Sequence, residues 1–133
     1  MTARLRLAVP LLAALLLAGC SSNDPTTCAD AGGVQTTDVT VGTGSAVATS
    51  NSTVTVRYTG TLQDGTTFDQ SENASFSLAR TVPGFRLGVT GMKIGGRRTI
   101  IIPPNLAYGA FPPSASIPPC ATLTFDVTLL DVR

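Results

Sequence analysis

Residues 54–68, VTVRYTGTLQDGTTF, predict the fold of this chain more directly than any other stretch. Apolar and polar residues alternate from Val54 to Tyr58, so one face of a strand is apolar and the other is polar. The Asp-Gly pair at 64–65 is typical of a tight turn, and Phe68 follows it in a second short segment. The stretch therefore predicts a hairpin in an antiparallel sheet that has one covered face.

Three further stretches show strand alternation. Phe76 and Leu78 alternate in one short strand, and Ile100 and Ile102 share a face in another. The last strand carries Leu123, Phe125, Val127 and Leu129 on one side and Thr122, Thr124, Asp126 and Thr128 on the other. These patterns extend the predicted antiparallel sheet to the end of the chain.

Residues 84–92, GFRLGVTGM, are the one predicted helical cover for this sheet. They follow Pro83, which suits a helix start, and Phe85, Val89 and Met92 recur at helical spacing. The glycines in this stretch predict a short helix that is held by packing rather than by propensity. The predicted class is α+β, a curved antiparallel sheet around one short helix.

The first 19 residues have the pattern of a signal peptide. Arg4 and Arg6 precede the apolar run 7–17, which is too short for a stable membrane-spanning helix. The run ends in Leu-Ala-Gly-Cys at 17–20, which resembles the bacterial lipobox. The alternative is an ordinary secretory signal with a chance cysteine at its end.

The lipobox resemblance implies lipidation of Cys20, as a diacylglyceryl thioether with palmitate-type chains and often a third chain on its amine. Two or more chains are needed for stable attachment to a membrane. We therefore expect an extracytoplasmic, lipid-anchored protein, in the outer membrane if the cell has one, because Ser21 rather than Asp follows Cys20. Residues 20–36 are expected to be a flexible tether and 37–133 the folded domain.

Two cysteines remain after cleavage, Cys28 and Cys120. An even pair in an exported protein favours a disulfide, which would join the tether to the folded domain. The alternative is that Cys28 never meets Cys120 and both thiols stay free.

The composition excludes several classes of function. The chain has no His, so it lacks the usual general base of serine and cysteine hydrolases and the commonest metal ligand, and we expect no metal or cofactor. It has nine Lys and Arg against eight Asp and Glu, without a basic stripe, so nucleic acid is not an expected partner.

Three blocks in order resemble the FKBP-type peptidyl-prolyl cis-trans isomerases, the macrolide-binding immunophilins. They are VTVRYTGTLQDGTTFDQS, TVPGFRLGVTGMKIGGRRTIIIPPNLAYGA and IPPCATLTFDVTLL, which are spread over residues 54–130 and cover most of them. The resemblance implies a half-barrel sheet wrapped on the short helix, with an apolar pocket between them.

The resemblance also implies the site. Tyr58, Asp69 and Tyr108 fall on catalytic positions, and the substrate-binding positions are Phe68, Phe76, Val82, Phe85, Ile117 and Phe125. Val82 would act through its backbone N–H, and Phe85 would be the floor beneath a proline ring. The loop 70–75 holds no Arg, so Asp69 is expected to lack the arginine partner of many relatives.

The function implied is isomerisation of X–Pro bonds in unfolded or exported proteins, without a covalent step. Macrolides are the expected small-molecule ligands, and a monomer is expected. The alternative is a membrane-tethered chaperone or interaction module that binds proline-containing segments without significant catalysis.

Overall fold

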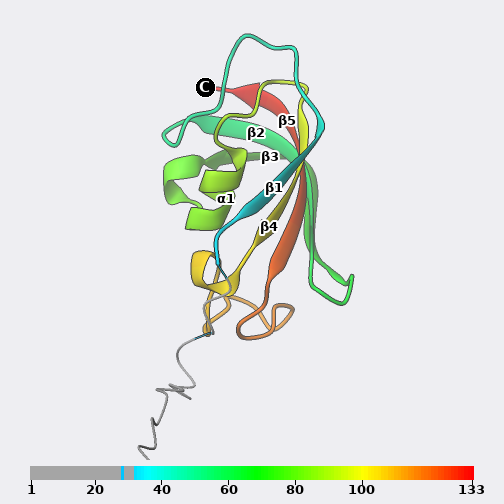
Figure 1. Ribbon diagram of the computed structural model, residues 1–133, viewed down its shortest axis with the longest axis vertical. Helices are drawn as coiled ribbons and strands as arrows, with labels where there is room; N and C mark the ends of the chain where they lie inside the picture. The colour runs from blue at the N-terminus through cyan, green and yellow to red at the C-terminus, as the bar shows by residue number, and fades with distance from the viewer. Residues whose placement is uncertain (1–27, 29–31) are drawn as a thin grey trace, which may run out of the picture.

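The computed structural model describes residues 28 and 32–133, and their fold is a five-stranded antiparallel sheet with one short α-helix against it (Figure 1). The strand order is β1-β4-β5-β2-β3. The elements are β1 (Gln35–Thr40), β2 (Thr53–Thr61), β3 (Thr67–Ser77), η1 (Leu78–Arg80), α1 (Pro83–Val89), β4 (Arg97–Ile102), η2 (Pro104–Leu106) and β5 (Leu123–Val132). The predicted fold class is confirmed.

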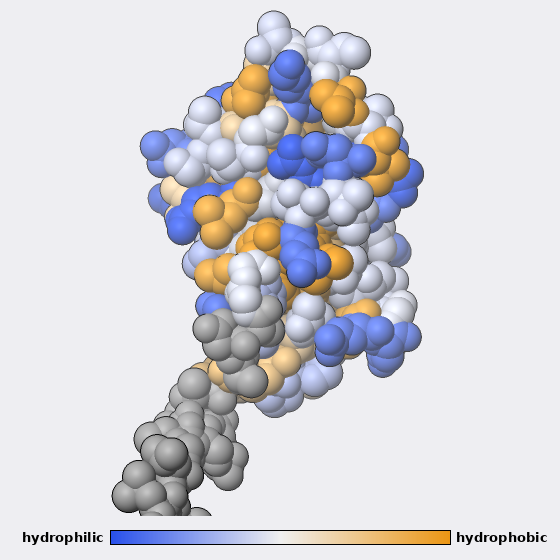
Figure 2. Space-filling view, viewed as in Figure 1, coloured by the Kyte–Doolittle hydropathy of each residue, from blue (hydrophilic) through white to orange (hydrophobic). Residues whose placement is uncertain are grey.

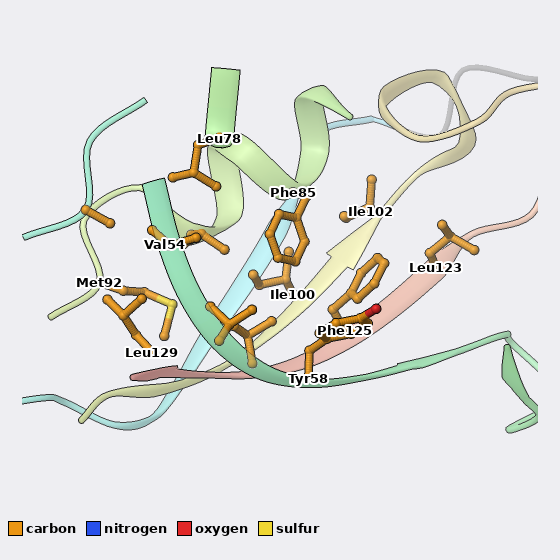
Figure 3. Close-up of a cluster of buried hydrophobic side chains, with 14 of the residues drawn as sticks. Val54, Tyr58, Leu78, Phe85, Met92, Ile100, Ile102, Leu123, Phe125 and Leu129 are labelled. Atoms are coloured by element: carbon orange, nitrogen blue, oxygen red, sulfur yellow. The ribbon is translucent and has the colours of Figure 1, made fainter. Parts of the chain in front are cut away.

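The apolar core lies between α1 and the sheet. Alternate residues of β2 and β5 are buried there, as their sequence pattern predicts: Val54, Val56 and Tyr58 from one, Leu123, Phe125, Val127 and Leu129 from the other. In Figure 3 the ring of Phe85 points from α1 toward these strands, beside Phe125 and Ile100. This arrangement leaves the polar face of the sheet away from the helix.

β3 differs from the prediction of two separate short strands. Phe68 and Phe76 lie in one strand, and Leu78 is not in it but begins η1, where its side chain is fully buried. β3 is an edge strand, and its register with β2 shifts between Val56 and Tyr58. A bulged edge strand has no consistent buried face, so its sequence lacks the period-2 pattern that marks β2.

The helix is shorter than predicted, since α1 ends at Val89 rather than at Met92. Both the N–H and the Oγ1 of Thr90 donate to the Arg86 carbonyl and close the last turn. Met92 is nonetheless buried in the core. Its spacing from Phe85 and Val89 therefore indicated a buried residue correctly, although the helix does not reach it.

A disulfide joins Cys28 to Cys120 across a sequence separation of 92. β1 begins at Gln35, two residues before the predicted domain start at 37. The predicted signal peptide, the lipidation residue Cys20 and most of the predicted tether lie outside the described residues. Within the described part of the chain, no helix is long and apolar enough to cross a bilayer.

Candidate active site

A pocket of about 290 Å³ opens between α1, the β2–β3 side of the sheet and the segment after β4. This volume is at the small end of the range for ligand sites. Its lining residues are Tyr58, Phe68, Asp69, Phe76, Arg80, Thr81, Val82, Phe85, Tyr108 and Phe125.

Aromatic rings form most of the wall. Phe85 and Phe125 meet edge to face with centroids 5.4 Å apart, and Phe68 meets Phe125 in the same way at 5.6 Å. Phe76 lies 5.8 Å from Phe85 and 5.7 Å from Tyr58. These spacings are those of favourable aromatic pairs, so each ring is held by its neighbours.

Local sequence explains how two of these rings reach the pocket. Phe85 lies in the first turn of α1, which Pro83 starts, and is almost completely buried. Phe68 lies against Gly60 of the paired strand, where a Cβ would come within 2.6 Å of the ring. Glycine at this position therefore leaves the room that the Phe68 ring occupies.

One hydrogen bond joins the two polar groups on the β2–β3 side of the pocket. The Tyr58 hydroxyl donates to Asp69 Oδ2 at 2.6 Å, and Asp69 Oδ1 accepts from the Gln70 N–H at 2.9 Å. Burial, and then the hydrogen bond to the Asp69 carboxylate and its negative charge, raise the pKa of Tyr58 well above its ordinary value of 10.0. Tyr58 thus stays a donor at neutral pH and fixes one Asp69 oxygen.

Val82 presents a backbone donor at the pocket. It is the N-cap residue of α1, and its carbonyl accepts from the N–H groups of Phe85 and Arg86. Its own N–H has no acceptor within the part of the chain that the structure describes. A peptide carbonyl entering the pocket would find this donor unpaired.

The structure brings together all but one of the pocket residues that the sequence predicted. Ile117 is not among the lining residues, and its side chain is buried in the same hydrophobic cluster as Tyr58 and Phe85. Sequence reasoning missed Arg80 and Thr81, which line the pocket from η1 and its C-terminal flank. Their place between Phe76 and Val82 in the sequence was the available indication.

The ion pairs among the described residues use Asp38, Glu72, Asp126 and Asp131, and none of them uses Asp69. Arg57 of the neighbouring strand pairs with Glu72 at 2.8 Å, on a largely exposed surface. Arg80 is therefore the cation that lines the same pocket as Asp69.

Comparison with protein families matches residues 44–130 to the model described as FKBP-type peptidyl-prolyl cis-trans isomerase. The chain belongs to the FKBP-type peptidyl-prolyl cis-trans isomerase family. The match covers β2 through most of β5 and so includes every residue that lines the pocket. The FKBP-type resemblance of the sequence blocks is thereby confirmed.

Individual FKBP-type relatives resemble the chain over its folded part. It is 41% identical over 107 residues to Drosophila melanogaster Peptidyl-prolyl cis-trans isomerase Fkbp12, covering 76% of this chain and 99% of that protein. It is 50% identical over 86 residues to Escherichia coli FkpA, which covers 61% of this chain and 31% of FkpA. For several of the curated relatives, FkpA included, the matched part of this chain spans only about a quarter to a third of the relative's length.

Solved FKBP-type structures give the same fold. The crystal structure of Escherichia coli FkpA matches with a TM-score of 0.69 and 44% identity, covering 76% of this chain and 48% of that chain. A peptidyl-prolyl cis-trans isomerase from Pseudomonas syringae pv. tomato matches with a TM-score of 0.71 and 35% identity, covering 75% of each chain.

Proposed function

We propose that this protein is a peptidyl-prolyl cis-trans isomerase that accelerates the folding of exported proteins. The observation that carries the proposal is the aromatic pocket, whose lining includes Phe85 and Val82, together with a Val82 N–H that has no acceptor among the described residues. Family membership supports the same reaction.

The reaction needs no nucleophile and no cofactor. Rotation about an X–Pro bond has a barrier of about 20 kcal/mol, because amide resonance holds the bond planar. At the twisted transition state this resonance is lost, and the amide becomes less dipolar. A dry aromatic pocket destabilises the planar, charge-separated amide relative to the twisted one, so it lowers the barrier without making a bond.

The lining residues would divide this work between shape and polarity. Phe85 would lie beneath the proline ring, with Phe68, Phe76 and Phe125 as walls. The Val82 N–H and the Tyr108 hydroxyl would donate to substrate carbonyls. Asp69, held by Tyr58, would orient the strained amide or its neighbours through its carboxylate.

The substrates proposed are X–Pro segments of unfolded or exported proteins, with an apolar residue before proline because the wall is aromatic. Macrolides are proposed as small-molecule ligands of the same pocket. We propose that the protein acts as a monomer.

We also propose that the protein is a lipoprotein, anchored through Cys20 to the extracytoplasmic side of a bacterial membrane, the outer one where there are two. The lipobox-like Leu-Ala-Gly-Cys directly after an apolar core supports this. The disulfide from Cys28 supports an oxidising, extracytoplasmic compartment.

The isomerase proposal is tested by a protease-coupled assay on a short apolar-X–Pro peptide with the mature protein. We expect a rate well above the uncatalysed one, and a clear loss in Phe85→Leu and Asp69→Asn. These changes are milder than truncation to Ala, because Phe85 also belongs to the core and its removal would cost about 3–5 kcal/mol of stability.

Leu87→Ala is the matched control, since Leu87 is an exposed residue of the same helix. An uncatalysed rate from folded protein that still binds proline peptides would establish the alternative, a tethered chaperone or interaction module. The lipid anchor is tested separately by mass spectrometry of the mature chain and by membrane fractionation of a Cys20→Ala variant. A water-soluble, acyl-free wild-type protein would reject the anchor and leave the isomerase proposal standing.

A further inference from the structure

The segment that follows β4, residues 103–122, has an unusual surface for an exposed loop. It lies within an uncharged stretch, because no Asp, Glu, Lys, Arg or His occurs between Arg98 and Asp126. Phe111 is 75% exposed, the highest value among the large apolar side chains of the described chain, and Tyr108 is 37% exposed. Its other exposed residues are Asn105, Pro113, Ser114, Ala115, Ser116, Pro118, Pro119 and Cys120.

Residues 103–122 form a braced surface and not a loose one. The Cys120 N–H donates to the Gly109 carbonyl at 2.8 Å, and the Gly109 N–H donates to the Pro104 carbonyl at 2.9 Å. Ile117 anchors the same segment in the core. Phe111 is therefore presented to solvent from a fixed base.

The N-terminal segment reaches the molecule at this same end. β1 starts at Gln35, which pairs with Ile101 at the end of β4, just before residue 103. The disulfide fixes Cys28 to Cys120 within the loop itself, with their Cα atoms 5.3 Å apart. In Figure 1 the orange loop and the start of β1 lie at the lower end, and the loop after β1 lies at the upper end.

Chain length then limits how far the lipid can be from this loop. Cys20 and Cys28 are eight positions apart in the sequence, a separation that corresponds to about 28 Å for a fully extended chain and roughly 16 Å for a flexible coil. A lipid on Cys20 would hold residues 103–122 within that distance of the bilayer surface. At such a distance even a weak contact with lipid is populated, because binding has become intramolecular.

We propose that residues 103–122 are a membrane-docking surface, with Phe111 inserted at the interface between headgroups and acyl chains. This inference rests on the proposed lipidation of Cys20. Aromatic rings favour this interface, and the absence of charge removes the main cost of approaching hydrocarbon. In Figure 2 the lower end that is free of grey atoms has pale and tan colours, whereas deep blue lies farther up and at the right.

Docking by this loop orients the catalytic pocket. Tyr108 lies in the same loop and lines the pocket. Docking therefore holds the mouth of the pocket near the membrane surface, where exported chains emerge. Because the loop is uncharged, docking depends little on anionic lipid, unlike that of basic segments.

The test uses the absence of Trp from the chain. The mature, lipidated Phe111→Trp protein is reconstituted in phosphatidylcholine vesicles. The reference is the same variant without its lipidated N-terminal residues, in buffer without detergent. Relative to this reference, we expect the tryptophan emission in vesicles to shift to shorter wavelength and to be quenched by brominated phosphatidylcholine. Adding the anionic lipid phosphatidylglycerol to the vesicles should leave both the emission shift and the quenching almost unchanged.

Val41→Trp is the matched control. Val41 is 69% exposed and follows the other end of β1, beyond the pairing of Thr40 with Arg97. Its emission should be the same in vesicles and in solution. Equal quenching of both reporters would mean that the anchored domain has no fixed orientation, and no quenching of the Phe111→Trp reporter would mean that the loop faces away; each result overturns the proposal.

Two other outcomes identify a different role. If Phe111→Ser lowers isomerisation of a soluble peptide while a Ser116→Trp reporter in the same loop is not quenched by brominated phosphatidylcholine vesicles, the loop serves the substrate and not the membrane. If Cys20 carries no lipid by mass spectrometry, both the anchor and the docking fail together. A lipidated Cys20 without quenching at residue 111 rejects docking alone.

Discussion

At the scale of single residues, the hydrogen bond between Tyr58 and Asp69 organises the polar part of the site. Tyr58 faces the core from β2. Asp69 lies in the neighbouring strand β3, opposite Gly60 of β2. The bond satisfies the hydroxyl of a buried tyrosine and fixes the carboxylate at the pocket edge. The same contact is part of why the pKa of Tyr58 is raised.

The raised pKa of Tyr58 predicts a loss of stability at alkaline pH. The folded state holds this proton more tightly than the unfolded state, so Tyr58 stabilises the fold below the unfolded pKa of about 10, and the stabilisation is lost as the pH rises toward the folded pKa. The free energy of unfolding of the wild type, measured with urea, should be lower at about pH 11 than at about pH 8. In Tyr58→Phe it should fall less.

Tyr108→Phe is the control for this prediction, because Tyr58 and Tyr108 are the only tyrosines of the chain. That variant should keep the alkaline fall of the wild type. An equal fall in wild type and Tyr58→Phe would show that Tyr58 does not carry the pH dependence.

At the scale of elements, the packing of α1 on β4 sets the position of Phe85. Gly84 and Gly88 are one helical turn apart and face Ile102 and Ile100 of the strand. A Cβ on Gly84 would lie 2.1 Å from Ile102 Cγ2, and one on Gly88 would lie 2.4 Å from Ile100 Cγ2. The helix therefore approaches the sheet closely only because these two positions lack side chains.

Gly84→Ala and Gly88→Ala should each destabilise the protein although Ala is the better helix former. The propensity gain is about 1 kcal/mol. Overpacking against the stiff, branched isoleucines costs typically about 1–3 kcal/mol, and we expect Gly84→Ala to be the worse because its Cβ would also lie 2.9 Å from the Leu106 carbonyl.

Urea unfolding of these variants measures the effect. The exposed helix residue Leu87 provides the comparison, since Leu87→Ala should change stability by less than about 0.5 kcal/mol. A stability gain in either glycine variant would mean that the helix can move away from β4 without cost.

At the scale of the whole molecule, the Cys28–Cys120 disulfide closes a loop that contains every strand except β5. It fixes the N-terminal segment to the loop that carries Tyr108. The backbone of Cys120 has a positive φ of 57°, which is uncommon for a residue with a side chain, and the bond from its N–H to Gly109 holds it there.

Removing this disulfide should lower stability substantially. In the loop-entropy model a cross-link over 92 residues contributes roughly 4.6 kcal/mol, so the Cys28→Ser/Cys120→Ser protein should unfold at clearly lower urea concentration. Wild type with reductant should behave like this variant. Identical midpoints for oxidised and reduced wild type would contradict the prediction.

By itself the sequence determined the class of fold and the buried faces of β2 and β5, whereas the pocket residues were inferred from its resemblance to the FKBP-type family. The physical reason is that each of these faces packs on one covered side of a sheet, and period-2 alternation records that burial locally. The short helix was also predictable, because Pro83 and the spacing of Phe85 and Val89 are local features.

Only the tertiary structure decided the rest. The continuity of β3, the presence of Arg80 in the pocket wall and the Tyr58–Asp69 bond depend on segments that meet in space. The bulged edge strand β3 has no consistent buried face, and the direction of a side chain in a loop is set by its contacts and not by its neighbours in sequence.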